Sequence, residues 1–158
     1  MTITEIQLLI TLLPLAYVGG AVIPILIADV REARVPNKIV YPMMLLTLLC
    51  WLTLAIWQGA WFNLGMAILL FIVGILLGSF LNINFDALGM GDVKLIATFM
   101  MMLGWFSWQV ALLFIPVIAL SALLYGFFYI MLSKNVSVIR LAPVVFVVFG
   151  FSLAVVLN

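Results

Sequence analysis

The chain has 158 residues, of which 69% are hydrophobic and only 7% are charged, and its formal net charge is +1. In a water-soluble domain about a quarter of all residues are charged, and they cover its surface. The composition of this chain therefore excludes a soluble globular domain and predicts a membrane protein. The small net charge gives no indication of a nucleic-acid partner. With no histidine and a single cysteine, Cys50, we expect no metal site, no internal disulfide and no cofactor.

Six apolar segments follow one another along the chain. A helical crossing of the bilayer takes about 20 apolar residues, so about six crossings account for the chain and leave only short loops. The sequence therefore predicts an all-α fold, a polytopic membrane bundle of about six transmembrane helices, as a single domain over residues 1–158. The expected helices cover Ile6–Ala28, Ile39–Trp57, Trp61–Leu81, Val93–Leu103, Trp108–Leu132 and Leu141–Leu157.

The fourth of these segments is short, and alone it could be a re-entrant or interfacial piece rather than a crossing. The basic residues favour a crossing, because six spans place all of them in three connections on one side of the membrane. By the positive-inside rule that side is the cytoplasm, and both termini then face outward. These basic residues are Arg31, Arg34, Lys38, Lys94, Lys134 and Arg140.

Two further features agree with this topology. The first segment begins with Glu5 and has no basic region before it, which predicts a retained helix rather than a cleaved signal peptide. The two outer turns are uncharged and flanked by tryptophans, which we interpret as an aromatic belt at the outer interface. These tryptophans are Trp57, Trp61, Trp105 and Trp108.

Two carboxylates belong to the cytoplasmic face in this topology. Asp29 closes the first apolar segment and Asp92 opens the fourth. Ionisable residues at the ends of apolar helices tend to be functional, and two carboxylates that share a proton can divide the roles of base and acid in peptide hydrolysis. Simpler interpretations remain open: Asp92 could cap its helix, and Asp29 could pair with Arg31 or Arg34.

The sequence around Asp92, GMGDVK, contains Gly89 and Gly91 directly before the carboxylate. Glycine permits close approach of another backbone, so an extended substrate could lie beside Asp92. GMGDVK resembles the GxGD signature of the type IV prepilin peptidases, a family of polytopic aspartyl proteases. The segment with Asp29, Arg31, Pro36 and Asn37 is similar to the other half of that signature.

The resemblance covers nearly the whole chain, and the size of the chain matches the minimal members that serve tight-adherence (Flp) pili. It implies an aspartic endopeptidase of the bacterial inner membrane that cleaves the leader of type IV or Flp prepilins at the cytoplasmic face. The partners it implies are membrane lipid and a prepilin, which consists of a leader and a hydrophobic helix. The oligomeric state stays open.

The resemblance also implies residue roles. Asp29 and Asp92 would be the catalytic pair, and Gly89 and Gly91 would shape the approach to Asp92. Lys94 would neutralise the site or contact the substrate, unless it only anchors the cytoplasmic end of its helix. We expect Asn37 to cap the second helix after Pro36.

The sequence leaves two alternatives to this function. Larger prepilin peptidases carry a cysteine-containing insertion and also methylate the new pilin terminus; this chain lacks that insertion, so we predict no methyltransferase activity. A non-enzymatic proton-coupled carrier or channel is the remaining alternative, although neither aspartate lies in the middle of a span.

Overall fold

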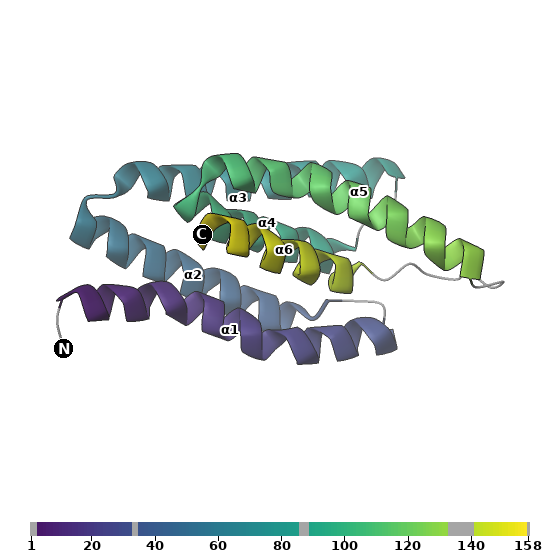
Figure 1. Cartoon of the computed structure of the whole chain (residues 1–158), viewed down its shortest axis with the longest axis horizontal. Coiled ribbons are helices and arrows are strands. Elements are labelled where there is room, and N and C mark those ends of the chain that lie inside the picture. Colours follow the sequence, from purple (N-terminus) through teal and green to yellow (C-terminus); the bar gives the residue numbers. More distant parts are fainter. Residues whose placement is uncertain (1–2, 33–34, 86–88, 133–140, 158) are drawn as a thin grey trace.

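The computed structural model describes residues 3–32, 35–85, 89–132 and 141–157, and these residues form six α-helices (Figure 1). The expected all-α bundle is confirmed, and the observed helices begin and end within a few residues of the expected ones. The largest difference is α1, which extends three residues before and four residues after the expected segment, and α4 extends three residues beyond the expected segment at each end. The helices are α1 (Ile3–Glu32), α2 (Asn37–Gln58), α3 (Trp61–Phe85), α4 (Met90–Phe106), α5 (Trp108–Leu132) and α6 (Ala142–Leu157).

Four of these helices are long and apolar enough to cross a membrane, as judged from length and composition. They are the segments Thr4–Glu32, Asn37–Gln58, Trp61–Ile83 and Trp108–Phe127. The apolar helix α6 is shorter, and α4 has 17 residues. The chain is thus a polytopic helical membrane protein, and the number of six crossings stays a prediction.

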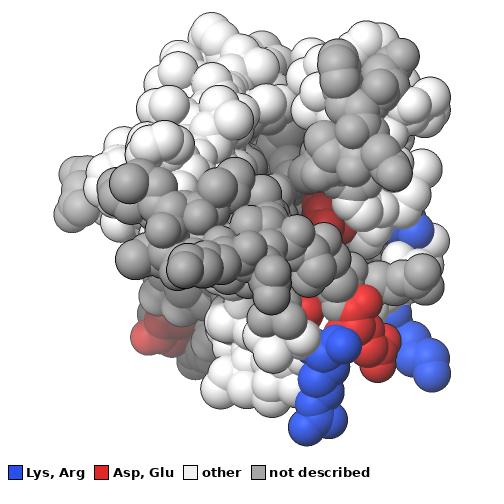
Figure 2. Space-filling view, turned by 90° about the vertical axis from the view of Figure 1, so that its right-hand side faces the viewer, with Lys and Arg blue, Asp and Glu red and all other residues white. Residues whose placement is uncertain are grey.

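Successive helices run in opposite directions, and the two chain ends lie at the same end of the bundle (Figure 1). The other end carries the last turn of α1 and the first turns of α2 and α4. We call it the charged end, because Asp29, Arg31, Lys38, Asp92 and Lys94 all lie there. Figure 2 looks onto this end and shows basic and acidic side chains gathered on one side of it. Arg34, Lys134 and Arg140, which the topology prediction also used, fall outside the described residues.

The short helix α4 is the centre of the bundle. It contacts α2, α3, α5 and α6, and every residue from Leu95 to Trp105 is buried. A helix that is apolar on all sides is one that neighbours enclose. Its apolar character on all sides is therefore explained by its central position.

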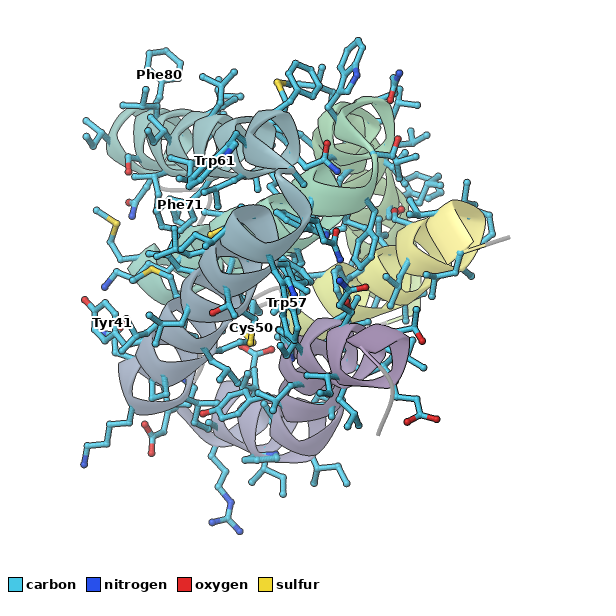
Figure 3. All side chains as sticks on the ribbon, turned by 90° about the vertical axis from the view of Figure 1, so that its left-hand side faces the viewer. Tyr41, Cys50, Trp57, Trp61, Phe71 and Phe80 are labelled. Atoms are coloured by element: carbon cyan, nitrogen blue, oxygen red, sulfur yellow. The ribbon has the colours of Figure 1, made fainter. Side chains whose placement is uncertain are left out.

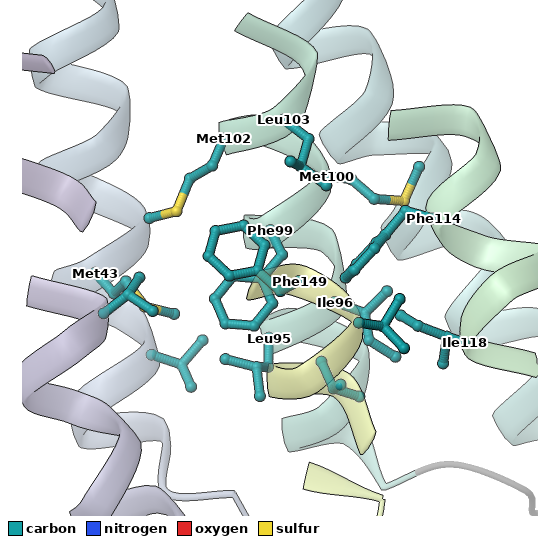
Figure 4. Packing of buried hydrophobic residues seen from close by; sticks show 14 of the residues in the cluster. Met43, Leu95, Ile96, Phe99, Met100, Met102, Leu103, Phe114, Ile118 and Phe149 are labelled. Atoms are coloured by element: carbon teal, nitrogen blue, oxygen red, sulfur yellow. The ribbon is translucent and has the colours of Figure 1, made fainter. Parts of the chain in front are cut away.

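Aromatic stacking and glycine contacts hold α4 in place. Phe99 stacks on Phe149 of α6, with ring centroids 4.0 Å apart, inside the larger hydrophobic cluster (Figure 4). On the opposite side, a Cβ added at Gly74 or Gly78 of α3 would lie 2.9 Å from Ala97 Cα or 2.7 Å from Val93 Cγ1. These two glycines therefore permit the close packing of α3 on α4.

The opposite end of the bundle carries part of the expected aromatic belt. Trp57, Trp61 and Trp108 are exposed, and Figure 3 shows the first two at the junction of α2 and α3. The assignment of Trp105 to the belt was wrong: this side chain is buried and stacks on Trp51, with ring centroids 5.0 Å apart. Trp105 belongs to the last turn of the enclosed helix α4, so it faces protein rather than the interface.

Candidate active site

Asp29 is a buried carboxylate in the last turn of α1. Only 4% of its surface is exposed, and its Oδ2 atom is inaccessible to solvent. Burial of an ionised carboxylate carries a large desolvation cost, so such a residue is retained where its chemistry is needed or where its charge is compensated. Asp29 is therefore a buried helical residue and not a solvated carboxylate in a loop.

Asp92 lies in the first turn of α4, ahead of the apolar part of that helix. The N-cap position is Gly89, and the backbone N–H of Gly89 donates a hydrogen bond to the Asp92 carboxylate. This contact satisfies one of the free N–H groups at the helix start, as in a capping box. The second carboxylate oxygen, Oδ1, is buried and accepts no hydrogen bond from the described residues. Helix capping thus uses only one of the two oxygen atoms of the Asp92 carboxylate.

The two aspartates, 63 positions apart in sequence, interact electrostatically. Burial and, to a smaller extent, the neighbouring Asp29 carboxylate raise the pKa of Asp92 from its usual value, the Gly89 hydrogen bond lowers it, and the net result is a pKa of about 6. Two like charges in a shared, partly buried site cannot both ionise easily, so such a pair keeps one proton at a higher pH than a lone carboxyl group. A pair in this state can provide a base and an acid at the same time.

Gly91 brings the start of α4 against the connection between α1 and α2. A Cβ added at Gly91 would lie 2.5 Å from the backbone oxygen of Val35 and 2.9 Å from the Val35 Cβ atom. Only glycine permits this backbone contact. The space that the sequence analysis assigned to a substrate at Gly91 is therefore filled by the protein's own chain, and Gly91 fixes the position of Asp92. Gly89 differs, since among the described atoms its added Cβ would meet only Asp92 Oδ2, at 3.1 Å.

Lys94 joins α4 to α2 at the charged end. Its ammonium group donates hydrogen bonds to Asn37 Oδ1 at 3.1 Å and to the Tyr41 hydroxyl at 2.9 Å, and it lies 4.8 Å from the centre of the Tyr41 ring. No ion pair between Lys94 and Asp92 occurs in the described structure. Residues two apart on a helix point about 200° away from each other. Lys94 thus holds one side of the first turn of α4 while Asp92 occupies another.

We expect the Lys94 contacts to stabilise the bundle. Lys94→Met should lower the free energy of unfolding by about 1 kcal/mol, because two hydrogen bonds of a charged donor are lost from a partly exposed site. Thermal unfolding in detergent would measure this change. Lys38→Met is the matched control, since it removes an equally charged, exposed side chain from the same end, and it should leave the unfolding temperature unchanged.

A double-mutant cycle would assign the loss to the bridge itself. Tyr41→Phe removes the hydroxyl acceptor and keeps the ring, so its effect should largely disappear in a protein that already carries Lys94→Met. Fully additive effects of the two substitutions would show that Lys94 and Tyr41 do not act together.

The structure brings together most of the residues singled out from the sequence. Asp29, Asp92, Gly89, Gly91 and Lys94 all lie at the charged end. Asp86 falls outside the described residues.

Two functional details were not foreseen. The expectation that Asn37 caps α2 was wrong: Pro36 occupies the N-cap position without a side-chain hydrogen bond, and Asn37 accepts from Lys94 instead. Tyr41 was missed altogether. The sequence does contain a pattern that could have indicated its role. Asn37 and Tyr41 are four residues apart and therefore share one face of an otherwise apolar helix.

The described carboxylates and the cysteine form no group of three or more that could hold a metal ion. The chemistry that this arrangement supports by itself is proton transfer by two neighbouring carboxyl groups. Such a pair can activate a water molecule and protonate a carbonyl oxygen without a nucleophilic side chain.

Comparison with known proteins gives one result. The model of the type IV leader peptidase family matches residues 16–131, a range that contains both aspartates and the GMGDVK segment. No curated protein and no solved structure gives a significant match.

Proposed function

The chain belongs to the type IV leader peptidase family, and from this premise we propose that it is an aspartic endopeptidase that removes the leader of type IV prepilins of the Flp kind. The observation that carries the proposal is the pair of electrostatically coupled aspartates, Asp29 and Asp92, at one end of a membrane bundle. Membership of the family makes the chain a protease of the leader peptidase type. The prepilin substrate and the catalytic residues are the proposal.

The proposed reaction is a hydrolysis without a covalent intermediate. In the proposed mechanism Asp92, the residue whose pKa is raised, carries the shared proton, and Asp29 acts as the base. The Asp29 carboxylate would take a proton from water as that water attacks the scissile carbonyl carbon. Asp92 would donate its proton to the carbonyl oxygen, which gives a tetrahedral gem-diol. As this species collapses, Asp92 would take a proton back from one hydroxyl group and Asp29 would pass its proton to the leaving nitrogen. The C–N bond would then break and release the leader and the new pilin terminus.

We propose that the charged end faces the cytoplasm. Arg31, Lys38 and Lys94 all lie there, which agrees with the positive-inside rule. A prepilin in the inner membrane would present its leader on that same side, just outside its own hydrophobic helix. In this orientation both ends of the chain face away from the cytoplasm.

Co-expression with a Flp-type prepilin tests the proposal. Wild type should shorten the precursor by the length of its leader, and the double variant Asp29→Asn/Asp92→Asn should leave it intact while accumulating in the membrane. Mass spectrometry of the pilin would locate the new terminus. An uncut precursor in wild type, together with proton flux that depends on Asp29 and Asp92 in vesicles, would overturn the proposal in favour of a carrier.

The pH dependence of cleavage follows from the raised pKa. Below about pH 6 the pair holds one proton and can act as acid and base; above that value both carboxylates become ionised and the acid is lost. The value of kcat/KM should therefore fall as the pH rises through about 6, with an apparent pKa that belongs to the pair. Cleavage of a purified prepilin in detergent across a pH series measures this limb. A rate that keeps rising above pH 8 would contradict the assignment of Asp92 as acid.

A further inference from the structure

A second recess, distinct from the aspartate pair, opens on the side of the bundle between α1 and α6. It has a volume of about 450 Å³, and its walls are almost entirely apolar. We call it the α1/α6 groove. On α6 its wall includes Pro143, Val147 and Gly150, which are three or four residues apart and therefore share one helix face. Val147 is 73% exposed, so an apolar side chain of this groove is left uncovered by the described chain.

The α1 wall of the groove leads to the candidate active site. The lining residues Leu15, Val18, Val22 and Leu26 recur every three or four positions along one face of α1. The next position on that face, three residues beyond Leu26, is Asp29. These lining residues span about 16 Å, and Asp29 follows about 4.5 Å further along the axis. The groove is thus an apolar track that ends at a buried carboxylate.

A glycine on each wall leaves the groove open to another backbone. Atoms added as Cβ at Gly19 of α1 or at Gly150 of α6 would meet no described atom within 4 Å. Helices in membranes pack closely where small residues let their backbones approach. Two open glycines that face one recess therefore suit a third helix, whereas a flexible lipid chain needs no such opening.

The larger apolar recess, between α3 and α5, lacks this property. It has a volume of about 540 Å³ and also contains two glycines, Gly74 and Gly78. The Cβ directions of both are already filled by α4, at 2.9 Å or less. Those glycines are explained by packing within the chain, and the glycines of the α1/α6 groove are not.

We propose that the α1/α6 groove holds the hydrophobic helix of the substrate, so that the peptide bond just beyond that helix arrives at Asp29. The inference rests on the proposed function and names the surface of this chain that selects a membrane-anchored substrate. One face of the substrate helix would fill the groove between Leu15 and Leu26. The segment to be cut would leave the helix at the charged end, where Asp29 and Asp92 meet.

Gly19→Leu and Gly150→Leu test the proposal, because each adds a side chain that occupies the groove and whose Cβ meets no described atom within 4 Å. Each should lower kcat/KM for a full-length prepilin by about tenfold or more, mainly through KM. Cleavage of a peptide that covers the scissile bond but lacks the hydrophobic helix should not change. Gly20→Leu is the matched control: Gly20 is equally open and neighbours Gly19 but does not line the groove, so both substrates should be cut normally.

Two outcomes would overturn the proposal. One is equal behaviour of Gly19→Leu, Gly150→Leu and Gly20→Leu toward the full-length prepilin. The other is an equal loss with both substrates, which would indicate damage to the aspartate pair rather than to docking.

A cross-linking experiment separates this inference from the proposed function, since it needs no cleavage. In a Cys50→Ser/Asp92→Asn background, Gly150→Cys should form a disulfide with a cysteine placed on the substrate helix, and Gly20→Cys should not. Cross-linking from both positions, or from neither, would exclude the α1/α6 groove as the docking surface. If the cross-link forms but wild type cuts no prepilin, the groove binds this helix and the peptidase assignment fails.

Discussion

Asp92→Asn is expected to lower the rate of prepilin cleavage by about 10²- to 10⁴-fold, because in the proposed mechanism the Asp92 carboxyl group supplies the proton for the scissile carbonyl oxygen. Asp29→Asn should cause a loss of the same size, since the base that activates water is then missing. Asparagine retains the size of the side chain and, at position 92, an oxygen that can accept the Gly89 hydrogen bond. We therefore expect both variants to fold and to insert as wild type does.

Initial rates with purified protein and a full-length prepilin would measure these losses. Glu32→Gln is the matched control, because Glu32 is an exposed acidic residue three positions after Asp29 on the same helix. Its rate should equal that of wild type. Near-normal cleavage by Asp29→Asn or by Asp92→Asn, in protein that is correctly inserted, would remove that residue from the mechanism.

Gly91→Ala is expected to reduce cleavage by about 10²-fold although it removes no chemical group. The added methyl group would lie 2.5 Å from the Val35 backbone oxygen, so the first turn of α4 must move away from the α1–α2 connection. Asp92 would move with it, and misplacement of a reacting group by about 1 Å can cost this much in rate. The forced shift should also lower the free energy of unfolding by about 1–3 kcal/mol.

Three glycines give a graded comparison. Gly89→Ala should have a smaller effect, because the Asp92 side chain, at 3.1 Å, is the only described group that its methyl group meets, and its backbone angles suit any residue. Gly65→Ala should have none, since no atom of the described residues lies within 4 Å of its added Cβ. Rates and thermal unfolding of all three variants, measured side by side, provide the test. If Gly65→Ala and Gly91→Ala behave alike, the contact with Val35 does not position Asp92.

The sequence was sufficient for features that depend on one segment at a time. Runs of apolar residues predicted six helices in the right places, because a helix in lipid must be apolar along its length. The alternation of helix directions then put Asp29 and Asp92 at one end of the bundle. Both steps use only the order of the segments and the positions of the charges.

Features that depend on several helices at once could not be predicted in this way. The apolar segment of α4 looked too short for a crossing because a sequence does not show which helix its neighbours enclose. Trp105 was placed at the interface for the same reason, whereas it stacks on Trp51. The role of Gly91 required the position of Val35, and that of Lys94 required Asn37 and Tyr41 on another helix.

The central position of α4 has a consequence for how the protein is made. Its apolar surface is covered only when α5 and α6 have joined α2 and α3 around it. During translation, α4, which carries Asp92, is therefore enclosed by its neighbouring helices only after α5 and α6 have been synthesised. Ribosome-bound intermediates that stop after α4 should consequently lack proteolytic activity, which we expect to appear only after α6 has packed against Phe99.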